Sequence, residues 1–229
     1  MAQRATAPRR MPLSRDRVLR AAVALADKEG IESVSMRRLA EELGVVPMAL
    51  YKHVANKDQL LDGLIDVVVG EIDPPISGNN WKSAIRNRIL SARQALLRHR
   101  WAAQVIESRT DPTPLLMNYM DSMIGMFLAG GFSLDLTHHV MHAMGSRLLG
   151  FSQELFNDSA TMDPQALAAM QRQLAGVYPN IAALTTAVYH DEGSVVAPGC
   201  DDQFEFEFAL DLLLDGLEKL RQKERTRHG

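Results

Sequence analysis

Residues 14–54 carry start and stop signals for three short helices, and this crowding constrains the fold more than any other feature of the sequence. Ser14 is a good N-cap for a first helix, and Gly30 is suited to end it. Ser35 can cap a second helix of two turns, which Gly44 ends. Short helices joined by such tight connections are typical of a helix-turn-helix unit.

Two further helices follow the second one, which we place at residues 36–43. A third is expected over residues 47–54, because a proline at its first position lacks only an amide that would have no partner there. Asn56 and Gln59 then form a capping-box-like start for a fourth helix, which ends before the two prolines at 74–75.

The spacing of three small or apolar residues sharpens the helix-turn-helix prediction. Two helices that cross tightly need a small residue at the contact, a turn residue that tolerates positive φ, and an apolar plug. Ala40, Gly44 and Leu50 fill these three roles in that order. An ordinary helical hairpin is the alternative that this triple alone leaves open.

The remainder of the chain also has helical periodicity, and no stretch alternates with period two over enough residues to predict a sheet. We therefore predict an all-α fold, with an N-terminal three-helix domain that contains the helix-turn-helix and a C-terminal helical bundle. The further helices are expected at residues 81–98, 102–108, 114–129, 133–156, 164–189 with a break near 176–179, and 203–223.

The net charge of −3 conceals an uneven distribution. Residues 1–60 carry eleven Lys and Arg against seven Asp and Glu, whereas residues 61–229 carry fourteen against twenty-one. A basic N-terminal part joined to an acidic remainder indicates that the first part faces a polyanion.

Several classes of protein are excluded by what the sequence lacks. It has no apolar run of the roughly 18 residues that a membrane-spanning helix needs, and residues 1–10 lead into no secretory signal. The single cysteine, Cys200, forms no intrachain disulfide, which fits a reducing cytoplasm. We find no phosphate loop, zinc-protease motif or nucleophile elbow. We therefore expect neither an enzyme nor a cofactor.

The helices expected at 133–156 and 203–223 have apolar residues over more than the single face that packing on one neighbour requires. They are either central helices of a large bundle or the interface of a homodimer. For the homodimer, the expected interface residues are Leu148, Phe208, Leu212, Leu213 and Leu217.

Two stretches, GIESVSMRRLAEELGV at 30–45 and LYKHVANKDQLL at 50–61, closely resemble the DNA-binding domain of the TetR family of transcriptional regulators. Later landmarks, including Trp81 and the GFSL sequence that starts at Gly131, resemble the C-terminal domain of the tetracycline-repressor type. The resemblance covers about residues 14–222.

This resemblance implies a cytoplasmic homodimeric repressor that binds a palindromic operator on double-stranded DNA and is released by a small molecule. It implies a DNA-binding domain at 14–73 and a ligand-binding and dimerisation domain at 74–229. Residues 1–13, which contain prolines and arginines and show no periodicity, are expected to form a disordered basic arm. A dimeric helical adaptor or sensor without sequence-specific DNA binding is the alternative function.

The third helix is expected in the major groove, about one DNA turn (roughly 34 Å) from its copy in the dimer. Phosphate contacts are expected from Ser35, Tyr51, His53 and Lys57, base contacts from Arg37 and Lys52, and thymine-methyl contacts from Met48 and Ala49. Pro47 and Ala49 replace a glutamine and a threonine of the tetracycline repressors, so their operator is not carried over. More of the base recognition is then expected from Arg37, from Lys52 or from the basic arm.

Methionines concentrate in the helices expected at 114–129 and 133–156, where they would form adaptable walls for an apolar ligand. The residues expected to contact this ligand are Arg109, Met117, Met120, His138, Met141 and His142. His138 and His142 lie one turn apart, which suits a ligand hydrogen bond, a structural role or a transition metal. No third metal ligand is evident, so we expect no metal site.

The tetracycline repressors hold a magnesium–drug chelate partly through two histidines. This chain has Ile106 and Ser146 at the aligned positions. We therefore expect an apolar effector with few polar groups rather than a magnesium–tetracycline chelate.

Overall fold

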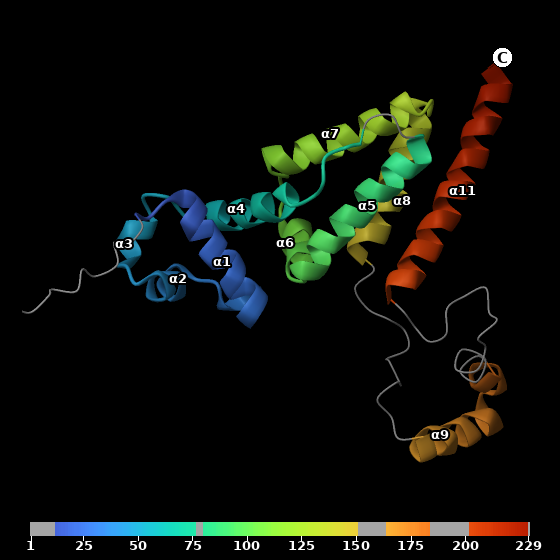
Figure 1. Cartoon of the computed structure of the whole chain (residues 1–229), viewed down its shortest axis with the longest axis horizontal. Helices are drawn as coiled ribbons and strands as arrows, with labels where there is room; N and C mark the ends of the chain where they lie inside the picture. Colours follow the sequence, from blue (N-terminus) through green and yellow to red (C-terminus); the bar gives the residue numbers. More distant parts are fainter. Residues whose placement is uncertain (1–11, 77–79, 151–163, 184–201, 229) are drawn as a thin grey trace, which may run out of the picture. The chain divides into compact units, whose positions relative to one another are not determined.

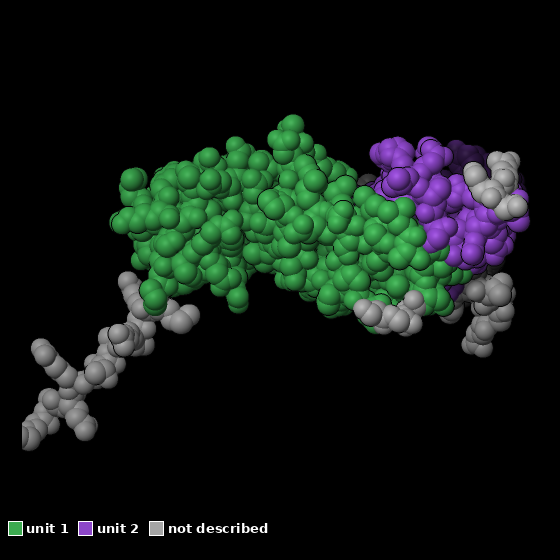
Figure 2. Space-filling view, turned by 90° about the horizontal axis from the view of Figure 1, so that it is seen from above, with its two compact units in different colours: residues 1–130 green, residues 131–229 purple. Residues whose placement is uncertain are grey.

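The computed structural model describes residues 12–76, 80–150, 164–183 and 202–228 (Figure 1). The chain divides into two compact units, residues 1–130 and 131–229 (Figure 2). Several predictions concern residues outside the described ranges. They are Cys200, nearly all of the predicted basic arm, and the predicted helical residues 151–156 and 184–189.

Every regular element in the described residues is a helix, which confirms the all-α prediction. The first unit contains α1 (Arg15–Glu29), the short 3-10 helix η1 (Ile31–Ser33), α2 (Met36–Leu43), α3 (Pro47–Leu50), α4 (Lys57–Gly70), α5 (Trp81–Arg98), α6 (Ala102–Ser108) and α7 (Pro114–Ala129). The second contains α8 (Leu134–Gly150), α9 (Pro164–Val177) and α11 (Asp202–His228).

The predicted caps determine where the N-terminal helices begin. The Ser14 side chain accepts a hydrogen bond from the amide of Arg17 at 3.2 Å, and Gly30 ends α1 with φ of 84°. At α4, the Asn56 side chain accepts from the amide of Gln59 at 2.8 Å. These side chains satisfy amides that the first helical turn leaves without partners.

The third helix is shorter than predicted, since α3 ends at Leu50 and not near Val54. The amides of His53 and Val54 both donate to the carbonyl oxygen of Leu50, at 2.8 and 3.0 Å, and this shared acceptor ends the helical pattern. Asn56 then needs an extended backbone, with φ of −158°, to cap α4.

One continuous apolar core runs through the first unit. It joins buried residues of α1, α2, α3, α4, α5 and α6, among them Val18, Leu39, Leu50, Leu64, Ala95 and Val105. Because α4 packs on α1 and also on α6 and α7, the compact unit continues past residue 73.

In the second unit, α8 and α11 are joined by polar contacts at both ends. Arg147 donates to the carbonyl oxygen of Glu205 at 3.1 Å, and its guanidinium lies 5.2 Å from the ring centroid of Phe206. Ser133, just before α8, donates to Glu224 at 2.8 Å. Since residues near opposite ends of the two helices meet, α8 and α11 run antiparallel.

None of the described helices combines the length and the apolar composition that crossing a membrane requires.

Candidate nucleic-acid interface

The connection between α2 and α3 has the geometry that its sequence predicts. Ala40 and Leu50 are buried at 1% and 0% exposure, so the small residue and the plug both lie in the contact. Gly44 has φ of 65° and ψ of 38°, in the left-handed region that glycine adopts without steric cost. Its amide and that of Val45 donate to the carbonyl oxygens of Glu41 and Ala40, which closes the end of α2. The turn between the helices is therefore fixed.

Opposite Leu50, α3 presents an exposed face to solvent. Met48 is 72% exposed and Tyr51 is 45% exposed. Lys52 is also exposed, whereas Ala49 and His53 are half-buried. The sequence analysis did not single out Val46, which is 67% exposed immediately before α3. Its position beside a proline at a helix start was the available signal.

Arg37 projects from α2 with 87% of its side chain exposed, and its Nε lies 3.2 Å from a carboxylate oxygen of Glu41. An ion pair this exposed contributes little to stability, so the guanidinium can exchange its carboxylate for phosphate or guanine at small cost. Lys57, also exposed, is the first residue of α4 and has no ion pair within the described residues.

The Ser35 side chain accepts from the amide of Arg38 at 3.2 Å and so caps α2. Arg38 itself donates to Glu29 of α1 at 3.0 Å. This hydrogen bond from Arg38 holds the pKa of Glu29 below its ordinary value. Arg38 thus ties the end of α1 to α2, while Arg37 stays at the surface.

A polar cluster joins α1, the end of α4 and the start of α6. His99 is buried, with Nδ1 lying 2.8 Å from Asp27 and Nε2 lying 3.1 Å from Glu71. Trp101 donates its indole N–H to the same oxygen of Asp27 at 2.7 Å. Burial raises the pKa of Glu71, but hydrogen bonds from Arg98 and His99 outweigh it, so the pKa lies below its ordinary value. The cluster links the N-terminal helices to α5 and α6.

Arg109, predicted to contact a ligand, forms ion pairs in the structure. It lies 2.8 Å from Asp58 and 2.9 Å from Asp62, both on α4. It also lines a pocket of about 660 Å³ whose wall is polar, with Asp66 and Arg15 among its residues. The surroundings of Arg109 are therefore charged, in contrast to the apolar site that we expected.

The other predicted ligand residues divide between the two units. Met117 and Met120 lie on α7 of the first unit, at 52% and 40% exposure. His138, Met141 and His142 lie on α8 of the second.

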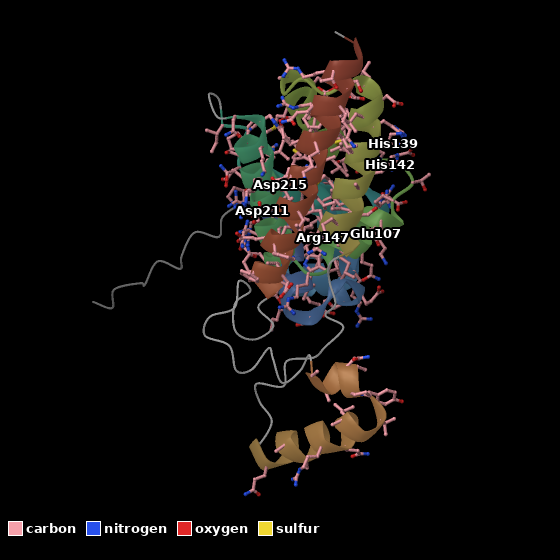
Figure 3. The ribbon with its side chains drawn as sticks, turned by 90° about the vertical axis from the view of Figure 1, so that its right-hand side faces the viewer. Glu107, His139, His142, Arg147, Asp211 and Asp215 are labelled. Carbon is pink, nitrogen blue, oxygen red and sulfur yellow. The ribbon has the colours of Figure 1, made fainter. Side chains whose placement is uncertain are left out.

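The rings of His138 and His142 meet edge to face with centroids 4.7 Å apart, as their spacing predicts. Figure 3 shows His139 and His142 projecting from the same side of α8. Within the described residues, no three His, Cys, Asp or Glu side chains are grouped to hold a metal ion.

The sequence analysis missed two buried charges on α5, Arg88 and Arg93. Arg88 of α5 is 9% exposed, and its guanidinium carbon lies 4.9 Å from the ring centroid of Tyr119 on α7. The available signal was its place in the buried stripe formed by Ile85, Ile89 and Ala92. An arginine on the core side of a helix indicates either a buried partner or a binding role.

Comparison with known protein families agrees with this architecture. Residues 18–64 match the model of bacterial regulatory proteins of the tetR family, and residues 74–221 match the tetracyclin repressor-like C-terminal domain. The chain belongs to the TetR family.

Individual TetR-family proteins match over most of the chain. The transcriptional repressor DrrR1 of Streptomyces coeruleorubidus is 31% identical, over 93% of this chain and 80% of DrrR1. The class D tetracycline repressor of Escherichia coli is 32% identical, over 68% of this chain and 72% of the repressor. Apo ActR of Streptomyces coelicolor superposes with a TM-score of 0.74 at 26% identity, over 93% of this chain and 99% of ActR. ActR is also known in complex with actinorhodin.

As a TetR-family member, the protein is a ligand-responsive transcriptional regulator, with a helix-turn-helix for operator DNA and a C-terminal domain for a small molecule. The exposed face of α3 is its candidate DNA-reading surface.

Proposed function

We propose that the protein is a cytoplasmic, non-enzymatic repressor that binds a palindromic operator as a homodimer and leaves it when an effector binds. Residues 14–73 would contact DNA, and residues 74–229 would bind the effector and form the dimer. The observation that carries the proposal is the exposed face of α3, held over the buried plug Leu50.

Within residues 14–73, which we call the head, the proposed DNA contacts fall into two chemical groups. Ser35, at the N-terminus of α2, and Lys57, at the N-terminus of α4, lie where helix dipoles and side chains favour phosphate. Met48 on α3 offers an exposed apolar group, and Tyr51, directly after α3, offers an exposed ring with a hydroxyl group. The proposed contacts are Ser35, Arg37, Met48, Ala49, Tyr51, Lys52, His53 and Lys57.

Footprinting on the DNA that flanks the protein's own gene tests this proposal. We expect a protected palindrome whose half-sites lie about one DNA turn apart, and binding that weakens steeply with salt. Lys57→Ala should lower the salt slope by about one unit on every sequence. Arg100→Ala is the matched control, because it removes an equal charge from an exposed site far along the sequence from residues 14–73. Absence of a protected site would refute the DNA-binding role.

The proposed dimer interface centres on the exposed side of α11. Phe208 and Leu212, one turn apart, are 45% and 58% exposed, which is unusual for large apolar side chains on one helix face. Leu213 and Leu148 are half-buried, and Leu217 is buried at 8% exposure. A second copy of α11 and α8 would cover this apolar side, since paired helices bury such faces in symmetric oligomers.

Sedimentation of Leu212→Glu tests the interface. The substituted carboxylate would lie unpaired against apolar surface, so we expect the variant to sediment as a monomer. Leu134→Glu is a suitable control, because Leu134 is 74% exposed at the first turn of α8. A Leu212→Glu variant that stays dimeric would exclude this side of α11.

We propose that the effector contacts Arg109, Met117, Met120, His138, Met141 and His142. The complex of the TetR-family relative ActR with actinorhodin supports an organic small molecule as effector. Ile106 and Ser146 stand at the positions of the two metal-binding histidines, which argues against a magnesium chelate here. His142→Ala should change the response to effector without changing operator affinity, and a loss of operator binding instead would make the residue structural.

A further inference from the structure

Arg88 is a buried cation with few partners. Its Nη1 donates to the carbonyl oxygen of Ile72 at 3.5 Å, the outer limit of a hydrogen bond. Its Nε is buried and has no hydrogen-bond partner in the described part of the chain. A guanidinium offers five N–H groups, so most of its donor capacity is unused.

No carboxylate of the described residues forms an ion pair with Arg88. Asp73 attracts the guanidinium through space, but it accepts a hydrogen bond from Ser91 at 2.9 Å and forms no ion pair with Arg88. Among the described residues, no carboxylate oxygen lies within 4.0 Å of Arg88. Arg98 and Arg109, in the same unit, each lie within 3 Å of a carboxylate oxygen.

The contact with Tyr119 offsets part of the cost of burial. A guanidinium above an aromatic ring is attracted to the π electrons of the ring. Its N–H bonds point outward in the guanidinium plane, so the ring does not accept hydrogen bonds from them. Burial lowers the pKa of Arg88, which is the electrostatic sign of a cation removed from water. A buried charge that retains open donors calls for a partner of opposite sign.

We propose that Arg88 binds an anionic oxygen group of the effector, so that the effector is an apolar molecule carrying a carboxylic or comparable acid. The planar fork of arginine matches the two oxygens of a carboxylate. Arg88 lies against Tyr119 of α7, the helix that also carries Met117 and Met120, which we assign to the effector site, so the inference rests on the proposed function. It replaces the expectation of an effector with few polar groups by a definite chemical class.

The melting temperature of Arg88→Met, measured without any added compound, distinguishes a structural role of Arg88 from a ligand-binding role. Methionine retains the length and apolar character of the side chain but removes the charge. If Arg88 serves to hold α5 against α7, the variant should melt at a lower temperature than the wild type. If the unpaired charge is kept for a ligand, the melting temperature should be unchanged or higher.

Matched acid and amide probes test the binding role directly on the full-length protein. The pairs are 2-naphthoate with 2-naphthamide and dodecanoate with dodecanamide, compared by thermal shift and calorimetry at up to millimolar concentration. We expect the acids to bind at least about tenfold more tightly than the amides, as a charge-assisted hydrogen bond allows. Arg88→Gln and Arg88→Met should abolish this preference, while the exposed Arg100→Gln retains it.

Three results would overturn the inference. If acids and amides bind the wild type equally well, the effector site does not require an acidic group. A preference that survives both Arg88 variants would place the anion elsewhere. Failure of every acid to bind would reject the acidic class. Footprinting on operator DNA remains independent of these outcomes, so failure of the proposed repressor function would be seen separately.

Discussion

The helix-turn-helix and the junction of α1 with α4–α6 are held together by different interactions. In the first, a glycine turn, a serine cap and a buried leucine act over a few neighbouring residues. In the second, charged and polar side chains from distant parts of the chain meet, as where Asp27 contacts His99 and Trp101. The head is therefore specified locally, whereas the junction depends on how the helices pack.

The largest expected effect is on the stability of the helix-turn-helix, which local interactions hold together. Leu50→Ala removes the buried plug and should lower the free energy of unfolding by about 3 kcal/mol, because the cavity adds to the lost transfer energy. Met48→Ala, two residues away on the exposed face, should leave stability unchanged and weaken operator binding. Urea unfolding and DNA titration of both variants measure these effects. Equal destabilisation by the two variants would contradict the assignment of the two faces.

Removing one carboxylate tests the junction. Asp27→Ala leaves the buried Trp101 N–H and one His99 ring nitrogen without their partner, which should lower the free energy of unfolding by about 2–3 kcal/mol. Asp16→Ala is the control, since its ion pair with Arg20 is largely exposed and contributes little. If chemical denaturation finds the two variants equally stable, the buried cluster does not stabilise the junction.

The buried phenol of Tyr119 should make the stability of the protein depend on pH. Burial raises the pKa of Tyr119 to about 12, so the phenol ionises first in the unfolded chain, near pH 10. The contribution of Tyr119 is complete below about pH 10 and is lost as pH rises toward about 12, by up to about 3 kcal/mol. Tyr119→Phe should therefore lose less stability than the wild type between about pH 9 and pH 11 in urea titrations. A parallel loss in both proteins would mean that the phenol is solvated.

The smallest effect concerns the surface of the head. Glu41→Gln releases Arg37 from its carboxylate and should tighten operator binding by about threefold, because the exposed ion pair is worth little. Glu32→Gln removes the same charge from an exposed site and is not paired with Arg37. A gain limited to Glu41→Gln in a mobility-shift titration supports base or phosphate contact by Arg37. An equal gain in both variants would reduce the effect to net charge.

Elements fixed by local signals were predicted well. The bounds of α2, α5, α6 and α7 follow from caps, glycines and prolines that act within one helical turn. The third helix was predicted too long, because nothing in the sequence shows that two amides share the carbonyl oxygen of Leu50. The direction in which Arg109 points depends on where α4 lies, so its ion pairs with Asp58 and Asp62 were not predicted.

By itself, the sequence determined the helical class, the helix-turn-helix and the family, because helix signals and the Ala40, Gly44 and Leu50 spacing act over short distances. The tertiary structure decided which charges are buried and which carboxylates they meet. The partner of an arginine is set by packing between helices distant in sequence, as the contrast between Arg109 and Arg88 shows. Burial then fixes how much that partner matters, since a charge removed from water requires compensation that an exposed charge does not.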